Sequence, residues 1–124
     1  MLYYIIPTSV KYKDVVLQKL LKSLSGATNP IIVIVNQADE QRMSVCNNVT
    51  YYEHPYCSYE YSAPLVALKL LSREDFFFWF HDTCEVGKDF NRIVNQFPYQ
   101  NFDFVDVYNG YCNFGIYSYT AVGG

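Results

Sequence analysis

The chain has 124 residues, of which 9 are Lys or Arg and 12 are Asp or Glu, giving a net charge of −3. This length predicts a single domain over residues 1–124, and a composition that is 51% hydrophobic and 19% aromatic excludes a disordered chain. The acidic balance argues against nucleic-acid binding, which needs basic side chains to neutralise phosphates. No apolar run reaches the roughly 18 residues of a membrane-spanning helix, and no secretory signal opens the sequence, so we expect a cytoplasmic protein with no membrane span.

The four cysteines are widely spaced and form no CxxC pair. They are Cys46, Cys57, Cys84 and Cys112. This spacing disfavours a zinc ribbon, whose ligands come in close pairs. Reduced thiols are the simpler interpretation for a cytosolic chain, and disulfide pairing is the alternative that the spacing leaves open.

The first half of the chain predicts a strand, a helix and two further strands. Residues 2–6 form a short apolar run before Pro7, which is typical of a buried strand followed by a loop. Apolar residues then recur every three or four positions over residues 16–24, which predicts an amphipathic helix ending at Gly26. Residues 31–35 are all β-branched and predict a strand buried on both faces, and residues 49–52 predict a weaker strand.

The second half predicts a helix, a strand, a helix and a last strand. Pro64 suits the first turn of a helix, and the apolar residues that follow it predict a well-buried helix. Residues 76–80 (FFFWF) predict a strand, residues 87–97 a short helix and residues 102–108 a final strand, after which residues 115–120 are again patterned. This order of elements predicts an α/β protein with a mainly parallel sheet.

Polar residues follow three of the predicted strands, where an α/β sheet binds its ligands. The first two clusters are Thr8 with Ser9, and Asn36 with Gln37 and Asp39. The third cluster is His81, Asp82, Thr83 and Glu85. Because the carboxyl ends of parallel strands share one edge of a sheet, we expect these clusters to form one site.

The third cluster contains the chemistry of a metal site. Imidazole, carboxylate and hydroxyl groups can all bind Mn²⁺ or Mg²⁺, and such an ion could bridge a diphosphate. The alternative is that Asp82 and Thr83 only cap the loop and that His81 is a hydrogen-bonded residue at the strand edge. Neither GxGxxG nor GxxxxGK[ST] occurs, which disfavours a dinucleotide enzyme and a P-loop kinase.

Further polar residues each allow a functional and a structural interpretation. Glu60 and Ser62 could face a phosphate from the start of the following helix, although capping is the simpler role for Ser62. His54 is expected to be a surface residue. Asp103 or Asp106 could act as a base on an acceptor hydroxyl, or lie at a solvated strand edge. The clustered tyrosines could stack on a sugar or base, or be half-buried at the domain surface. They are Tyr51, Tyr52, Tyr56, Tyr59, Tyr61, Tyr108, Tyr111, Tyr117 and Tyr119.

Several segments resemble the nucleotide-sugar-binding half of GT-A-fold glycosyltransferases. They are YYIIPTSVKYKDVVLQKLLKSL, NPIIVIVNQADE, DFFFWFHDTCEVGKDF and YNGYCNFGIYSYTAVGG. In that family an apolar strand ends in a DxD motif, which binds a divalent metal and the sugar-nucleotide diphosphate. His81, Asp82 and Thr83 lie where that motif would be, with Asp82 its one carboxylate.

The resemblance implies a three-layer α/β/α fold with a mainly parallel central sheet. It also implies a metal-assisted glycosyltransferase that moves a sugar from a nucleotide-diphosphate donor to a glycan or other hydroxyl acceptor. The nucleotide-binding candidates are Thr8, Ser9, Asn36, Gln37 and Asp39. The candidates for holding Mn²⁺ or Mg²⁺ are Asp82, His81, Thr83 and Glu85.

One alternative to an active transferase stays open, and a second is disfavoured. The acceptor-binding half of the family would lie beyond Gly124, and two outer carboxylates of the motif are replaced. A catalytically silent binding domain with the same fold is therefore the main alternative. A flavodoxin-like domain is disfavoured because residues 7–10 (PTSV) make a poor phosphate loop.

Overall fold

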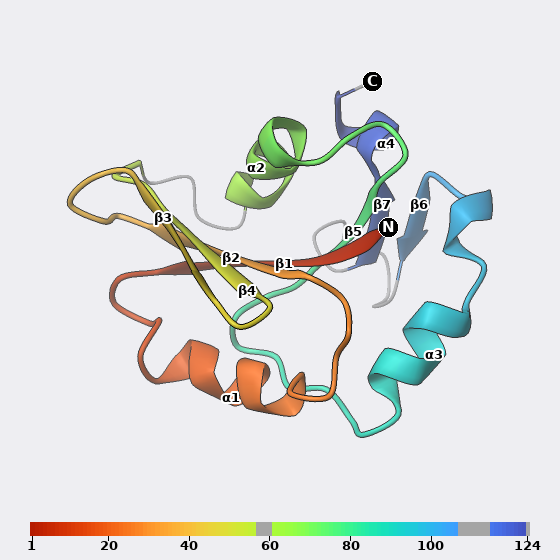
Figure 1. The fold of residues 1–124 in the computed structure, drawn as a ribbon, viewed down its shortest axis with the longest axis horizontal. Coiled ribbons are helices and arrows are strands. Elements are labelled where there is room, and N and C mark those ends of the chain that lie inside the picture. The colour runs from red at the N-terminus through yellow and green to blue at the C-terminus, as the bar shows by residue number, and fades with distance from the viewer. Residues whose placement is uncertain (57–60, 107–114, 124) are drawn as a thin grey trace.

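The computed structural model describes residues 1–56, 61–106 and 115–123 (Figure 1). The elements run in the order β1 (Leu2–Ser9), α1 (Val16–Ser23), β2 (Ile31–Asn36), β3 (Arg42–Cys46), β4 (Val49–Glu53), α2 (Ser62–Leu70), β5 (Phe76–Trp79), α3 (Phe90–Gln96), the 3-10 helix η2 (Tyr99–Asn101), β6 (Phe104–Asp106), β7 (Gly115–Ser118) and α4 (Tyr119–Gly123). The α/β class predicted from the sequence is confirmed.

The seven strands form one mixed sheet in the order β3-β4-β2-β1-β5-β7-β6. The four central strands β4, β2, β1 and β5 pair in parallel, whereas β3–β4, β5–β7 and β7–β6 pair antiparallel. The prediction of a mainly parallel sheet is therefore wrong. The reason is that β3 and β7, which were not predicted from the sequence, make the three antiparallel pairings: β3 pairs with β4, and β7 pairs with both β5 and β6.

Strand β1 continues through Pro7, where the sequence predicted a loop. The backbone nitrogens of Tyr4 and Val10 donate toward β2, so by alternation the nitrogen of Pro7 faces the β5 side. Pairing with β5 has already ended there, at Ile5 with Trp79. Proline has no N–H to donate, but no hydrogen bond between β1 and β5 is needed at this position.

Helices lie on both sides of the sheet, with α1 and α3 on one side and α2 and α4 on the other (Figure 1). One buried cluster includes Tyr4 and Ile6 of β1 together with Leu17 and Leu20 of α1. The second cluster includes Ile5 of β1 with Ala63, Val66 and Ala67 of α2. Successive residues of β1 thus pack into the two cores on opposite faces of the sheet, because side chains alternate across a strand.

Helix α2 is less buried than predicted from its sequence. Ala63 and Ala67 are fully buried, but Leu65 on the same helix is 60% exposed. The helix covers only one face of the sheet, so its outer leucine remains in solvent.

Aromatic side chains fill much of the core beside α1 and α3. The ring of Tyr4 makes edge-on contacts with Phe78, Phe80 and Phe90, at centroid distances of 6.3, 5.3 and 6.1 Å. The hydroxyl of Tyr4 donates to Asn91 on α3 at 2.9 Å, so the buried phenol is paired. These contacts give part of the aromatic excess a packing role.

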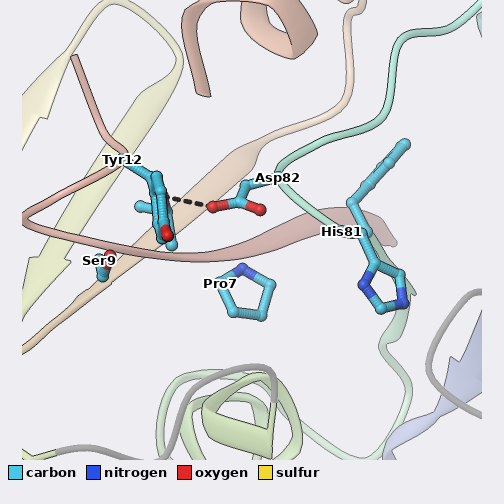
Figure 2. A pocket seen from close by; sticks show the side chains of 7 residues that line it. Pro7, Ser9, Tyr12, His81 and Asp82 are labelled. Carbon is cyan, nitrogen blue, oxygen red and sulfur yellow. Dashed lines mark hydrogen bonds between the residues drawn. The ribbon is translucent and has the colours of Figure 1, made fainter. Parts of the chain in front are cut away.

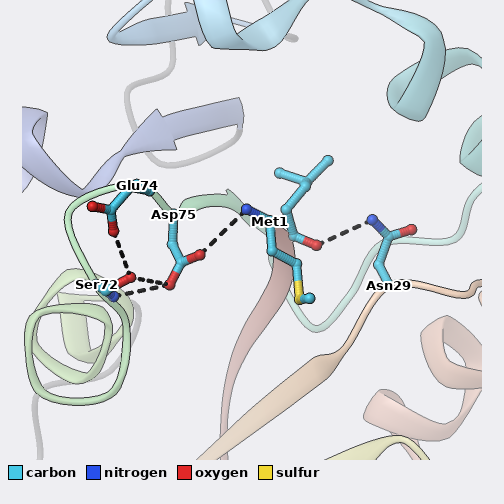
Figure 3. A network of polar contacts seen from close by, with 6 residues as sticks. Met1, Asn29, Ser72, Glu74 and Asp75 are labelled. Atoms are coloured by element: carbon cyan, nitrogen blue, oxygen red, sulfur yellow. Dashed lines mark hydrogen bonds and ion pairs between the residues drawn. The ribbon is translucent and has the colours of Figure 1, made fainter.

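A polar network fastens the amino end of β1 to the turn before β5 (Figure 3). The carboxylate of Asp75 accepts bonds from the backbone N–H and hydroxyl of Ser72, at 2.9 and 3.0 Å, and from the amino group of Met1 at 3.3 Å. Burial alone would raise the pKa of Asp75, but the bonds from Ser72 and Met1 outweigh it and lower that pKa.

The hairpin of β3 and β4 has a two-residue connection in which Asn47 has a φ of 59°. Asparagine tolerates this left-handed conformation better than most residues. Every residue of β3 is exposed, so the strand lacks the alternation of a half-buried strand that would have predicted it.

Cys46 and Cys84 are free thiols, and Cys57 and Cys112 lie outside the described residues. Within the described part of the chain, no helix combines the length and apolar character needed to cross a membrane.

Candidate functional site

A crevice lies at the carboxyl end of β1, where the chain connections to the two neighbouring strands run to opposite sides of the sheet. After β1 the chain passes through α1 to β2 on one side, whereas β5 on the other side is reached from β4 through α2. Such a switch point leaves the carboxyl ends of the two adjacent strands uncovered. A cavity of about 140 Å³ occurs here (Figure 2). It is lined by Pro7, Thr8, Ser9, Tyr12, Phe80, His81 and Asp82.

Thr8 and Asp82 meet in this crevice. The Oγ1 of Thr8 donates to Oδ2 of Asp82 at 2.8 Å. Thr8 is two residues beyond Ile6 in β1, and Asp82 is two residues beyond Phe80, so both side chains continue the face that packs under α1. The structure therefore brings together a residue predicted to bind nucleotide and a residue predicted to bind metal.

His81 and Asp82 diverge. Figure 2 shows the imidazole of His81 on the same side of β1 as the ring of Pro7, and the carboxylate of Asp82 on the opposite side. Thr83 and Glu85 are exposed in the loop that follows. Nowhere in the described residues do three His, Cys, Asp or Glu side chains gather as a metal site would require.

Asn36 lies behind the crevice. Its side chain is fully buried, and its Nδ2 donates to the carbonyl oxygen of Thr8 at 2.8 Å and to the hydroxyl of Ser62 at 3.3 Å. These bonds hold the end of β1 against the start of α2. Asn36 thus shapes the crevice without lining it.

The other predicted nucleotide-binding residues divide into two groups. Ser9 lines the crevice, but Gln37 and Asp39 are exposed and are not among its lining residues. Gln37 has a φ of 62°, a conformation uncommon outside glycine. The turn directs the backbone N–H of Gln37 to the carbonyl of Tyr56 and that of Ala38 to the carbonyl of His54.

Tyr12 is a crevice residue that the sequence analysis did not select. The backbone N–H groups of Tyr12 and Lys13 both donate to the carbonyl of Ser9, so a tight turn after β1 places the ring at the crevice. Tyr12 is 44% exposed, and the ammonium of Lys11 lies 5.3 Å from the centroid of its ring. The signal in the sequence is the motif KYK at residues 11–13, in the loop that follows the first predicted strand.

Cys84 is not an activated nucleophile. Burial raises the pKa of its thiol, and the nearby charge of Asp82 adds to the increase, although a backbone hydrogen bond with His81 opposes it. A raised pKa keeps the thiol protonated near neutral pH.

The remaining candidates have mixed outcomes. His54 is only 7% exposed, so its prediction as a surface residue is wrong. Ser62 is buried and its hydroxyl accepts a bond from Asn36 at 3.3 Å, and Asp103 accepts a bond from the hydroxyl of Ser118 at 3.1 Å. Glu60, Tyr59, Tyr108 and Tyr111 lie outside the described residues, as does the side chain of Asp106.

No protein-family model matches this chain, and no curated protein matches its sequence significantly.

Proposed function

We propose that this chain is the donor-binding domain of a GT-A-like glycosyltransferase and that it holds the diphosphate of a nucleotide sugar in the crevice between β1 and β5. The observation that carries the proposal is the bond between Thr8 and Asp82 at the switch point of the sheet. The parallel centre of the sheet and the helices on both of its sides support the three-layer GT-A arrangement, which is part of the proposal.

The size of the crevice favours the diphosphate as the group bound there. Sites that enclose a drug-sized ligand occupy roughly 300–1,000 Å³, and the crevice has about 140 Å³. The crevice, as the described residues form it, therefore has room for part of a nucleotide sugar, such as its diphosphate. The exposed ring of Tyr12 offers an aromatic surface on which a base or sugar can stack.

A divalent cation fits the crevice if most of its ligands come from the diphosphate and water. Mg²⁺ is commonly held by one or two carboxylates plus phosphate oxygens, and Asp82 is the carboxylate that lines the crevice. When bound, the cation would neutralise charge on the departing nucleoside diphosphate. The role of Thr8 is to orient the carboxylate of Asp82 toward the crevice through its hydrogen bond.

One observation favours the alternative of a catalytically silent binding domain. His81 and Asp82 occupy opposite sides of the strand end, so they do not converge on one ion as adjacent motif residues would (Figure 2). A domain that binds nucleotide sugar without transferring the sugar would keep the crevice and lose the metal ligands.

Calorimetric titration tests the proposal. UDP, GDP and their glucose and mannose conjugates are titrated with and without Mn²⁺. We expect one nucleotide to bind, with affinity that increases in Mn²⁺ and decreases at least about tenfold in Asp82→Asn, which loses the charge but keeps the shape. Asp89→Asn is the matched control, because Asp89 has a 57% exposed side chain and does not line the crevice.

The outcomes separate the alternatives. Absence of binding by every nucleotide, or an equal loss in both variants, contradicts the proposal. Binding without release of sugar to water or to added glycans, with or without Mn²⁺, favours the silent domain.

A further inference from the structure

A second cavity lies between strand β4 and helix α2. It has a volume of about 270 Å³, and its lining residues include Tyr52 and His54 from the end of β4 and Leu65 and Lys69 from α2. None of these residues lines the crevice between β1 and β5. This cavity is therefore a separate place where a ligand can bind.

Two donors converge on the hydroxyl of Tyr52. Lys69 Nζ donates to it at 2.7 Å, and Gln41 Nε2 donates at 2.9 Å. A phenol oxygen that accepts two bonds has its own proton left to donate, and an ammonium that makes one bond has two further N–H groups. Tyr52 is only 8% exposed, so this arrangement is anchored in the fold.

His54 adds a buried donor. The backbone N–H of Tyr56 donates to Nδ1 of His54 at 3.2 Å, so Nδ1 is the acceptor and the proton is on Nε2. Burial lowers the pKa of His54, which keeps the imidazole neutral. Its Nε2 is buried and has no hydrogen-bond partner in the described structure. A buried donor without an acceptor is costly, and a bound acceptor would remove that cost.

The remainder of the lining is neutral or apolar. Val66, Leu65 and the ring of Tyr56 form walls, and no Asp or Glu is among the described residues that line the cavity. Lys69 is the charged residue of the lining. Donor groups and a positive charge beside an apolar wall suit an anionic oxygen carried on an apolar body.

We propose that this cavity binds a small organic oxyanion, either a carboxylate or a phosphate monoester, between Tyr52, His54 and Lys69. One ligand oxygen accepts from the ammonium of Lys69 and the phenol of Tyr52, and binding turns the buried Nε2 of His54 toward a second ligand oxygen. The apolar part of the ligand packs against Leu65 and Val66. The inference does not depend on donor binding in the crevice, because the lining residues are different.

Nuclear magnetic resonance titration of the ¹⁵N-labelled chain tests this proposal. The probes are phenyl phosphate, benzoate and inorganic phosphate, with benzyl alcohol as the neutral counterpart. We expect phenyl phosphate or benzoate to shift the Nε2–H signal of His54 and the backbone signals around Tyr52 and Lys69. Benzyl alcohol should bind at least about tenfold more weakly, because it lacks the charge-assisted bonds.

Two lysine variants provide the matched comparison. Lys69 and Lys22 are both basic residues in the last turn of their helices. Lys69→Met should weaken binding of the anionic probes about tenfold or more, and Lys22→Met should leave it unchanged. Melting curves of both variants serve to check that each one still folds.

The outcomes are decisive. Response to phenyl phosphate alone assigns the site to phosphate esters, and response to benzoate as well assigns it to oxyanions in general. The proposal is wrong if no anionic probe shifts these signals, if benzyl alcohol binds as well as the anions, or if both lysine variants weaken binding equally. A His54 imidazole protonated on Nδ1 would also overturn it.

Discussion

The hydroxyl of Thr8 donates to the carboxylate of Asp82 at 2.8 Å, although the two residues are 74 positions apart in the sequence. Parallel pairing of β1 with β5 brings their carboxyl ends together, and the alternation of side chains places both residues on the α1 side. A local turn cannot make this contact. It therefore reports whether the two halves of the crevice are correctly assembled.

Replacing Thr8 by valine removes this bond with little change in side-chain shape. We expect Thr8→Val to lower the free energy of unfolding by about 1 kcal/mol, the usual net contribution of such a bond. If the crevice binds a nucleotide diphosphate, its affinity should decrease as well, because the carboxylate of Asp82 is no longer held in place. Urea unfolding and calorimetric titration measure the two effects, with Thr50→Val in β4 as the control. Unchanged values for both quantities would show that the bond has no role.

The buried amide of Asn36 should not tolerate a carboxylate. In Asn36→Asp, the N–H groups that bond to Thr8 and Ser62 are lost, and a charge is placed in a fully buried position. We expect a loss of about 3 kcal/mol in unfolding free energy at pH 7. Burial raises the pKa of the new carboxyl, so the deficit should shrink as pH falls and the group is protonated. The exposed Asn101→Asp serves as control, and an equal, pH-independent loss in both variants would refute this account.

Asp75 should stabilise the fold at neutral pH and cease to do so in acid. Its pKa in the folded chain is lowered below the ordinary aspartate value of about 3.9, so its contribution is complete above that pH and disappears as pH falls through the folded pKa. We expect Asp75→Asn to cost about 1 kcal/mol at pH 7, through weaker bonds with Ser72. Urea unfolding at several pH values should show the difference between variant and parent closing below pH 4. A constant difference would mean that charge is not the cause.

Replacing Gly115 by alanine should destabilise the fold. A methyl group there would collide with the backbone carbonyl of Val105 on the neighbouring strand β6. We expect Gly115→Ala to lower the free energy of unfolding by about 1–3 kcal/mol, the usual cost of overpacking. Gly87→Ala is the control, because its added methyl meets open space, and its effect should range from neutral to slightly stabilising. Equal melting temperatures for the two variants would contradict the close approach of β6 and β7.

Local patterns predicted the elements whose apolar residues follow a clear period. The repeat of Leu17 and Leu20 predicted α1, and the β-branched run predicted β2, whose residues are all buried. β3 has no such period, and the patterned residues 115–120 that contain β7 were not assigned to a strand. Strand β3 is exposed throughout. Strand β7 has four residues and follows β6 in the chain, but it lies between β5 and β6 in the sheet.

The sequence by itself determined where helices and buried strands form, and that polar residues follow three strand ends. It could do so because the spacing of apolar side chains reports which face of each element leaves water. Only the tertiary structure decided which of those polar residues meet. Pairing of distant strands joined Thr8 to Asp82, and it left His54, whose backbone N–H bonds to Val35 of β2, only 7% exposed. These outcomes depend on contacts between residues far apart in the chain, and no local pattern encodes such contacts.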